Sequence, residues 1–338
     1  MHVSTDRLLS RLVAQAGLPP VLRSDAFDGG ALGLDNSLTR AVLADGREVL
    51  LRVNPAQPLA PDRRALFLAA CGVGAPTFHA ADGNGASLVD FIPGLPLADL
   101  VVAGEDTAEI WERTGAAFAR VHAVRFPAPL QGTVGPLSIQ LSPCDPVEDL
   151  LASLDRSRSW VGRHKPHLFV AWATLRLLIR GHAHRVRAET PCLVHGDANL
   201  LNVIVGPGGV TLIDWDFPAV RYPLAELSAL DEHVYLSGGE GLPDPFFRGY
   251  GAAVPRDLLL LYRMVGCLQW LSGDDWPSWD RDTALPPPAR RRIREWHRRL
   301  LDWADQIPDL CRGLERAPGP GQEGPTEGHH PDPQQSLP

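Results

Sequence analysis

The stretch His195-Gly196-Asp197-Ala198-Asn199-Leu200-Leu201-Asn202 is followed, eleven residues after Asn202, by Ile213-Asp214-Trp215-Asp216. Together the two segments carry an aspartate, an asparagine five residues later, and a second aspartate beyond a short predicted hairpin. Oxygen atoms of Asp and Asn are suitable ligands for a hard cation such as magnesium. One further carboxylate is suited to orienting a hydroxyl nucleophile. These are the polar parts of a phosphoryl-transfer centre.

Each polar side chain of this pattern has a chemical role that suits its type. Asp197 is a weak base, since the ordinary pKa of an aspartate is about 3.9, but a loose phosphoryl transition state needs positioning more than early deprotonation. Asn202 offers a neutral carbonyl oxygen to a cation, and Asp214 offers an anionic one. Asp and Gly also occur in ordinary turns, but the complete order favours the functional interpretation. His195 is expected to be a structural histidine that hydrogen-bonds the loop.

Length and composition limit the class of protein. A chain of 338 residues with 44% hydrophobic residues is long enough for two lobes with a real core. The net charge of −8 argues against a nucleic-acid partner. The apolar segment 258–271 is too short and too interrupted to span a membrane, and the first residues do not resemble a signal peptide. The five cysteines are scattered, which predicts reduced thiols in the cytoplasm.

The lysine content excludes one common way of binding phosphate. Lys165 is the only lysine in the chain. A Walker A loop requires Gly-Lys-Ser/Thr, so a P-loop enzyme is excluded. Lys165 follows Arg163 and His164 in a predicted turn between helices, where a solvated role is expected.

Two regions of different character are predicted along the chain. The first contains a short amphipathic helix at 4–16, a hairpin of strands 38–43 and 48–53 around Asp45-Gly46, a helix between Pro61 and Gly72, and two further strands within 76–92. From Pro93 onward the pattern is mainly helical, with predicted helices near 106–124, 168–186, 256–271 and 287–304 and a hairpin at 203–213. Residues 316–338 have almost nothing apolar to bury and are predicted to be a disordered tail.

The segments Leu193 to Asn202 and Val210 to Asp216 resemble the catalytic region of the aminoglycoside phosphotransferase and choline kinase superfamily. Three other segments extend the resemblance over about residues 25–235, namely 72–76, 87–94 and 119–122. The resemblance implies an α+β, protein-kinase-like bilobal fold. Its small antiparallel-sheet lobe would be the nucleotide-binding lobe, 1–92. Its larger, mainly helical lobe, 93–315, would carry the catalytic loop and the acceptor site.

The resemblance also implies roles for individual residues, with ATP and Mg2+ as cofactors. Asp197 would be the catalytic aspartate, and Asn202 and Asp214 would bind magnesium. Arg52 stands where a protein kinase has its phosphate-binding lysine, and an arginine can hold phosphate oxygens through a fork of donors. Asp62 is near the position of the helix glutamate that pairs with that cation, although its side chain is one methylene shorter.

Further positions follow from the same resemblance. Backbone amides of Asn36 and Ser37 would contact the phosphates, and the segment from Asp90 to Ile92 would offer backbone groups to adenine. Asp216 falls on a recurrent acidic position of the motif. Glu226 stands where the family often has an aspartate.

The acceptor must be chosen by residues after 225. Acidic residues and tryptophans recur there, and an acidic cleft with an aromatic wall would suit an amino sugar, another polyamine or a quaternary amine. The alternative is that the acidic residues are solvated surface and the tryptophans are core. For Trp296 and Trp303, which share a helix face with Ile293 and Leu300, the core is favoured.

Three functions therefore remain open. The first is an ATP- and Mg-dependent O-phosphotransferase that acts on a hydroxyl of a small molecule, an aminoglycoside-like or other antibiotic or an amino sugar. The second is a metabolic kinase for choline, ethanolamine, homoserine or a simple sugar. The third is a non-catalytic nucleotide-binding regulator. A zinc hydrolase using His195 and Asp197 is disfavoured, because no further histidine stands at ligand spacing on the same element.

Overall fold

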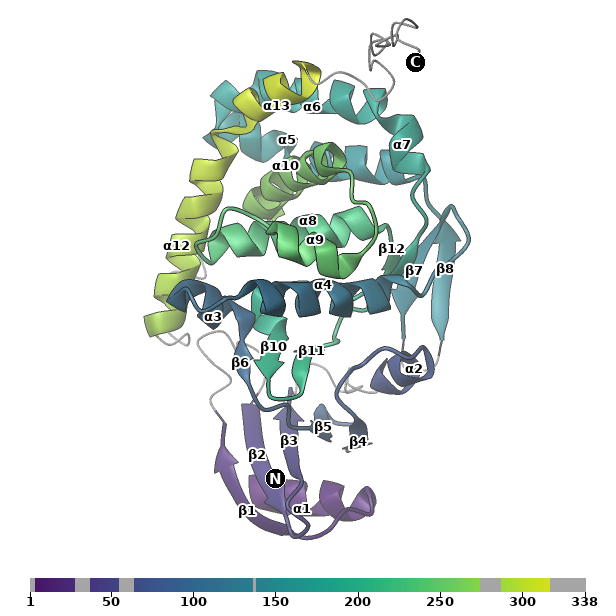
Figure 1. Ribbon diagram of the computed structural model, residues 1–338, viewed down its shortest axis with the longest axis vertical. Helices are drawn as coiled ribbons and strands as arrows, with labels where there is room; N and C mark the ends of the chain where they lie inside the picture. Colours follow the sequence, from purple (N-terminus) through teal and green to yellow (C-terminus); the bar gives the residue numbers. More distant parts are fainter. Residues whose placement is uncertain (1–3, 28–36, 55–63, 136–137, 274–286, 317–338) are drawn as a thin grey trace, which may run out of the picture.

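A computed structural model describes residues 4–27, 37–54, 64–135, 138–273 and 287–316 of the chain. It has the expected α+β architecture, with a small antiparallel sheet at one end and a larger, mostly helical region at the other (Figure 1). The β10–β11 hairpin, β6 and α2 lie where the second region faces the small sheet in this view. None of the described helices combines the length and apolarity needed to cross a membrane.

The small sheet has five antiparallel strands in the order β1-β2-β3-β5-β4. The strands are β1 (Val21–Ala26), β2 (Ser37–Leu43), β3 (Glu48–Val53), β4 (Phe78–Ala81) and β5 (Ala86–Asp90). The hairpin between β2 and β3 turns at Gly46, whose φ of 85° lies in the left-handed region that glycine adopts without strain. This hairpin and the β4–β5 pair confirm the predicted strands. The sequence pattern did not predict β1.

The N-terminal helix α1 (Thr5–Gln15) covers this sheet. Its apolar side, Leu9, Leu12 and Val13, is buried in one hydrophobic cluster with strand residues such as Leu51 and Leu88. The side chain of Ser4 caps the helix by accepting a hydrogen bond from the Arg7 amide at 3.4 Å. The predicted helix at 4–16 is confirmed.

Two further sheets lie in the second region. The first has the order β11-β10-β6 and the second β8-β7-β12-β9. Their strands are β6 (Leu95–Pro96), β7 (Leu130–Val134), β8 (Ile139–Pro143), β9 (Cys192–Val194), β10 (Val203–Gly206), β11 (Gly209–Leu212) and β12 (Ala219–Arg221). The β10–β11 hairpin confirms the one predicted at 203–213. β12 pairs with β9, which brings the segment after Asp216 beside the strand that leads into His195.

Helices make up most of the second region and bury the main core. They are α2 (Arg64–Ala70), α3 (Leu97–Ala103), α4 (Ala108–His122), α5 (Pro146–His164), α6 (Phe169–Gly181), α7 (Ala183–Arg187), α8 (Pro223–Leu236), α9 (Asp244–Tyr250), α10 (Arg256–Gly273), α12 (Pro287–Ala304) and α13 (Ile307–Arg316), with 3-10 turns η2 (Pro166–Leu168) and η3 (Leu200–Asn202). The predicted helices near 106–124, 256–271 and 287–304 are confirmed as α4, α10 and α12. Trp303 is buried and Trp296 packs against the same core, as expected.

Two predictions in this region need correction. The apolar pattern from Leu168 to Val186 is interrupted at His182, so it forms α6 and the short α7 instead of one helix. Lys165 is not simply solvated, because its Nζ lies 2.7 Å from a carboxylate oxygen of Asp305 and its side chain is only 17% exposed. The lysine therefore links the end of α5 to the segment after α12. The division at residues 92 and 93 stays a prediction. Of the predicted tail 316–338, Arg316 is the last residue of α13, and 317–338 lie outside the described residues.

Candidate active site

The loop after β9 changes direction at Gly196. Its φ is 84°, and a Cβ atom at this position would stand 1.8 Å from the carbonyl oxygen of Phe217. Only glycine satisfies both the left-handed backbone and the close approach. The turn brings the loop against the segment that follows Asp216, so the two halves of the sequence motif are in direct contact.

His195 fixes the loop to the second half of the motif. Its Nε2 lies 2.8 Å from the carbonyl oxygen of Ile213, and the amide of Asp197 donates to its Nδ1 at 3.3 Å. Its ring packs on Trp215, with the centroids 4.4 Å apart, and it is buried. Both ring nitrogens are therefore used inside the protein, in agreement with the structural role expected for this histidine.

Two asparagine side chains hold the carboxylate of Asp197. Asn199 Nδ2 donates to Oδ1 at 3.0 Å, and Asn202 Nδ2 donates to Oδ2 at 2.9 Å. Asn199 also caps η3, because its Oδ1 accepts from the amides of Leu201 and Asn202 at 2.9 and 3.1 Å. The role of Asn199 was not predicted from the sequence, although asparagine side chains commonly stabilise turns by bonding to the backbone two residues on.

Asp214 occupies an unusual backbone conformation. Its φ of 63° makes it the only non-glycine residue in the left-handed region within the described part of the chain. Such a conformation costs about 1–3 kcal/mol in a folded protein and recurs at functional sites. The indole of Trp215 donates to the carbonyl oxygen of Leu212 at 2.9 Å and thereby fixes the residue that follows Asp214.

Arg52 reaches this segment from the other region of the molecule. It lies on β3, is buried, and places Nη2 2.5 Å from Oδ1 of Asp214 and 3.4 Å from Oδ1 of Asp216. The structure thus brings Arg52 and the second half of the motif together across 162 residues of sequence. Asp216, whose role the sequence left open, is buried and faces the same guanidinium group.

A second arginine supports the same segment and was missed by the sequence analysis. Arg64, at the start of α2, donates from Nη1 to the carbonyl oxygen of Asp216 at 2.8 Å. Its Nε donates to the carbonyl oxygen of Val134 at 2.9 Å. No local pattern marks this residue, since both contacts are with residues distant in sequence.

The other predicted nucleotide contacts are only partly described. Asn36 and Asp62 lie outside the described residues. Ser37 is the first residue of β2 and pairs with Val53 of β3, the residue that follows Arg52 in the sequence. The Asp90 carboxylate lies 2.7 Å from His79 Nε2 and its amide donates to the Thr77 carbonyl oxygen at 3.0 Å.

Hydrogen bonds of Asp90 and Phe91 attach the segment after β5 to the small sheet. Phe91 donates its amide to the carbonyl oxygen of Glu48 at 3.1 Å, which continues the pairing between β3 and β5. Ile92 is half-buried and follows at the point where the chain leaves the sheet. Contacts from Asp90 to Ile92 with adenine stay a prediction.

Glu226 has a defined structural role. Its Oε1 accepts from the Gly196 amide at 2.8 Å, and its Oε2 lies 2.8 Å from His122 Nε2. The other ring nitrogen of His122 lies 2.8 Å from the hydroxyl of Tyr250. Burial opposes ionisation of Glu226, but the hydrogen bond and charge of His122, assisted by the Gly196 amide, outweigh it and lower its pKa. This buried chain fixes the catalytic loop to α4, α8 and α9.

The side-chain oxygens of Asn202 and Asp214 are suitable ligands for a magnesium ion that is also bound by phosphates. Asn202 uses its Nδ2 for two hydrogen bonds to Asp197, to the main-chain oxygen at 3.0 Å and to Oδ2, and thereby keeps its carbonyl oxygen for another partner. Asp214 adds one carboxylate. No group of three or more His, Cys, Asp or Glu side chains suited to a metal occurs in the described parts of the chain. Magnesium commonly binds through one or two protein ligands plus substrate phosphates and water.

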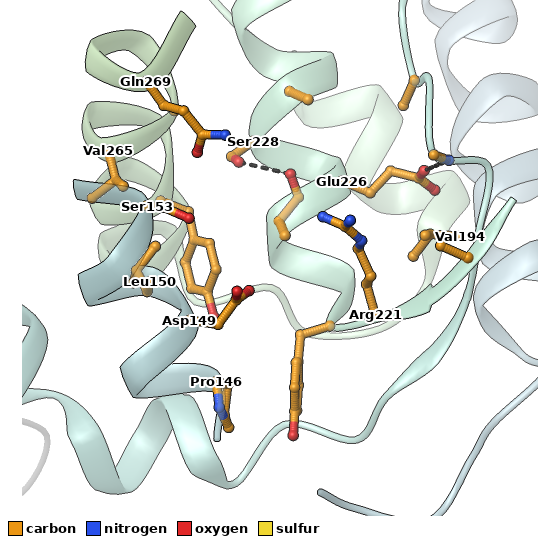
Figure 2. Close-up of a pocket in the computed structure, with 18 of the residues that line it drawn as sticks. Pro146, Asp149, Leu150, Ser153, Val194, Arg221, Glu226, Ser228, Val265 and Gln269 are labelled. Atoms are coloured by element: carbon orange, nitrogen blue, oxygen red, sulfur yellow. Dashed lines mark hydrogen bonds between the residues drawn. The ribbon is translucent and has the colours of Figure 1, made fainter. Parts of the chain in front are cut away.

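A cavity of about 720 Å³ opens beside the catalytic loop. Gly196 and Ala198, the residues on either side of Asp197, line it together with Phe217. The remaining wall comes from α5, α8 and α10 and from strands β7, β9 and β12. Figure 2 shows Asp149, Ser153, Arg221, Ser228 and Gln269 around the cavity. Such a volume is within the range of about 300–1,000 Å³ found for small-molecule sites.

The acidic residues expected to line an acceptor cleft divide into three groups. Asp231 is buried and pairs with Arg263 at 2.5 Å, whereas Asp244 lies 3.1 Å from Arg256, is exposed and does not line the cavity. Glu226 and Glu232 line the cavity. The acidic residues and tryptophans at 274–280 lie outside the described residues, whereas Trp270 lines the cavity.

Comparison with known protein families shows the family to which this chain belongs. Residues 30–261 match the phosphotransferase enzyme family, which is more than half of the chain. The chain belongs to this family. The matched residues include Arg52, the loop 195–202 and Asp214, whereas Gln269 and Trp270 of the cavity lie beyond the matched range. A comparison with curated protein sequences finds no match.

Solved structures share the fold of this family member at low sequence identity. A choline/ethanolamine kinase family protein from Mesorhizobium loti superposes with a TM-score of 0.55 and 17% identity, over 93% of this chain and 95% of that one. The macrolide 2'-phosphotransferase MphH from Brachybacterium faecium gives 0.51 and 17%, over 83% and 98%. The GDP and kanamycin complex of APH(2")-IIia gives 0.53 and 16%, over 90% and 98%. The kinase-like fold is therefore shown, and the family to which the chain belongs makes the protein a phosphotransferase.

Proposed function

We propose that this phosphotransferase moves the γ-phosphoryl group of ATP to a hydroxyl of an aminoglycoside-like or other antibiotic, or of an amino sugar. One observation carries the proposal: the loop that bears Asp197 is bonded through His195 to Ile213, beside the Asp214 that Arg52 contacts, and Gly196 and Ala198 of the same loop line a large cavity. In the proposed arrangement the phosphates bind on the side of Arg52 and Asp214, the acceptor binds in the cavity, and the two meet at the carboxylate of Asp197.

Asp197 orients the acceptor hydroxyl and accepts its proton as the phosphoryl group is transferred. The hydrogen bonds from Asn199 and Asn202 hold both of its oxygens in place. Because the transition state of phosphoryl transfer is loose, fixed positioning contributes more than base strength. Arg52 neutralises charge on the transferred group and its leaving phosphates.

ATP and Mg2+ are the proposed cofactors. Asn202 and Asp214 would hold the metal through a neutral and an anionic oxygen, and the ion would neutralise charge on the phosphates. Arg52, now in contact with Asp214, would gain the phosphates as a further anionic partner. Asn36, Ser37 and the hinge from Asp90 to Ile92 remain the proposed contacts for the phosphates and the adenine, and Asp62 the proposed partner of Arg52.

The size of the cavity favours a large acceptor over a small metabolite. About 720 Å³ is a volume typical of drug-sized ligands and exceeds what choline, ethanolamine or homoserine would fill. Phe217, which is 61% exposed, and Trp270 offer aromatic surface to a ring, and Ser153 and Gln269 offer neutral hydrogen-bonding groups. A hydroxyl-rich ring suits this lining, whose charged side chains include Asp149, Arg156 and Arg221.

The setting proposed for this reaction is the cytoplasm, where ATP is available. All five cysteines are free thiols, in keeping with a reducing compartment. The negative net charge of −8 supports a small-molecule partner over a nucleic acid. We propose no membrane partner.

The test is an acceptor panel with purified protein, ATP and Mg2+, read by mass spectrometry for an added phosphate. Asp197→Asn and Asp214→Asn are each expected to lower kcat by about 10²–10⁴-fold, the usual contribution of a positioned catalytic group. Asp155→Asn, on the exposed side of α5, is the matched control and should leave kcat unchanged. Full activity of both site variants would overturn the proposal. ATP binding without transfer to any acceptor would favour the regulator instead.

A further inference from the structure

Helix α8 carries three buried carboxylates, and two of them have complete protein partners. Glu226 bonds to His122 and the Gly196 amide. Asp231 accepts from Arg263 at 2.5 Å and from the amide of Leu242 at 2.6 Å. These protein partners account for the burial of Glu226 and Asp231 inside the helical region, and neither residue needs a ligand.

Glu232 is the third, and its position is different. It is 4% exposed and lines the cavity, yet its Oε1 has no hydrogen-bond partner among the described residues. A buried acceptor without a partner is costly, and native proteins rarely retain one without a reason. The cavity beside it provides the space in which a ligand could supply the missing donor.

The groups packed around Glu232 do not complete its hydrogen bonding. On α10, Arg263 donates from Nη1 to Asp231, and its Nε and Nη2 have no hydrogen-bond partner among the described residues. Its guanidinium group lies 4.6 Å from the Trp303 ring centroid and 5.3 Å from that of Tyr235. The Cys267 thiol lies against the Glu232 carboxyl group and also contacts the Leu300 carbonyl oxygen at 3.6 Å. Glu232 lines the cavity, but its Oε1 is itself covered, so a donor from a ligand reaches this oxygen when the carboxyl group turns toward the cavity.

We propose that Glu232 is the specificity-determining residue of the acceptor cavity and accepts a hydrogen bond from an N–H group of a primary or secondary amine. The inference rests on the proposed function and adds a selection rule to it. A quaternary ammonium group has no N–H donor, so it leaves the buried oxygen unpaired and is disfavoured at this position. Glu232 belongs to the cavity and not to the loop that bears Asp197, so in this proposal it acts on binding of the acceptor and takes no part in the chemical step.

The titration of Glu232 gives a signature that a purely structural carboxylate would lack. Burial raises the pKa of Glu232 to about 8. The charge of Arg263 and a hydrogen bond from Cys267 act to lower this pKa, and the charge of Asp231 acts to raise it. An ammonium group bound beside it favours the ionised form, so binding of the amine releases a proton. The KM for an amine acceptor should therefore fall as the pH rises from 6.5 to 8.

The experiment compares matched acceptors that differ at nitrogen. Ethanolamine is paired with choline, glucosamine with glucose, and kanamycin is the large amine acceptor. Wild type, Glu232→Gln and the control Glu240→Gln, which is exposed after the end of α8, are assayed at pH 6.5 and 8. Glu232→Gln is expected to raise the KM for amine acceptors by about 10-fold, the loss typical of a charged hydrogen bond, with kcat nearly unchanged. It should also abolish the pH dependence of KM.

The outcomes separate this inference from the proposed function. An unchanged KM in Glu232→Gln, or an equal rise for choline and glucose, overturns the role of Glu232 while phosphotransfer itself stands. If no acceptor is phosphorylated by any variant, the proposed function fails and the shift in Tm produced by kanamycin decides the inference. A shift in wild type and Glu240→Gln that is lost in Glu232→Gln supports it, and an equal shift in all three, or none in any, overturns it.

Discussion

Gly196 is the residue whose replacement tests the geometry of the catalytic loop. In Gly196→Ala the new methyl group would lie 1.8 Å from the Phe217 carbonyl oxygen, at a φ of 84°. Either the loop or the segment after Asp216 must then move, and a displacement of about 1 Å at a catalytic group costs about 10²-fold in rate. We expect kcat to fall by about that factor while the fold persists. Enzyme assays and circular dichroism provide the measurements.

Gly238→Ala separates backbone strain from the clash. Gly238 also has a left-handed φ, 110°, but nothing lies within 4 Å of an added Cβ atom. It follows α8, away from the loop, so the substitution should lower stability by about 1 kcal/mol and leave kcat intact. A wild-type kcat in Gly196→Ala would contradict the close contact between the two halves of the motif.

At this scale, local spacing predicted the candidate residues better than it predicted their partners. The order of Asp197, Asn202 and Asp214 follows from the hairpin between the two segments, which the sequence shows directly. The contact of Arg52 with Asp214 spans 162 residues, and that of Arg64 with Asp216 spans 152. Such contacts depend on how the two regions are packed, which no local pattern encodes.

Helices α4 and α9 carry the support of the catalytic loop, since His122 ends α4 and Tyr250 ends α9. The two helices approach closely at Gly115 and Gly249. A Cβ atom on Gly115 would be 2.0 Å from the Phe246 carbonyl oxygen, and one on Gly249 would be 1.8 Å from that of Glu112. Small residues at both positions therefore set the distance between the helices.

Gly115→Ala is expected to destabilise the protein by about 1–3 kcal/mol, the range observed when a packed interior is overfilled. Because α4 holds Glu226 through His122, kcat should fall as well. The matched control is Gly162→Ala in α5, where nothing lies within 4 Å of the new methyl group. Alanine is the better helix former, so that control should stabilise the protein by about 0.5–1 kcal/mol. Urea unfolding distinguishes the two, and equal effects would refute the packing argument.

Among the elements, the long periodic ones were predictable and the short paired ones were not. The apolar face of α4 and the Asp45-Gly46 hairpin carry strong local signals. Strands β9 and β12 are three residues each and form a sheet only because distant segments pair. The break between α6 and α7 falls at His182, directly after Gly181, a glycine that the apolar series around it concealed as a helix end.

Across the whole molecule, two neighbouring buried groups oppose each other in their dependence on pH. Glu232 has a pKa raised to about 8 by burial, against an ordinary value of 4.5. His233, whose ring lies 5.0 and 5.4 Å from the centroids of Trp270 and Trp296, has its pKa lowered by burial from 6.5 to about 3. Both groups are neutral in the folded protein near pH 5 to 6, where the unfolded chain ionises them.

The sign of each contribution follows from proton binding by the two states. Between pH 4.5 and about 8 the folded protein retains a proton on Glu232 that the unfolded chain loses, so the free energy of unfolding falls as the pH rises. Between about pH 3 and 6.5 the unfolded chain binds a proton at His233 that the folded protein does not, so the free energy of unfolding falls as the pH drops. The two effects offset each other in the overlap and leave a maximum of stability there.

We therefore expect Glu232→Gln and His233→Phe to change opposite limbs of the stability curve. Urea unfolding between pH 4 and 8.5 should show a flatter alkaline limb for Glu232→Gln, since its amide does not titrate. It should show a flatter acid limb for His233→Phe, which keeps an aromatic ring between the two indoles. The slope is the decisive quantity, because a uniform loss of stability from imperfect packing moves the curve without tilting it. Exposed Glu240→Gln should leave both limbs as in wild type. Parallel curves for all four proteins would mean that neither buried group titrates as its surroundings require, and would also remove the physical basis for a proton release at Glu232 on amine binding.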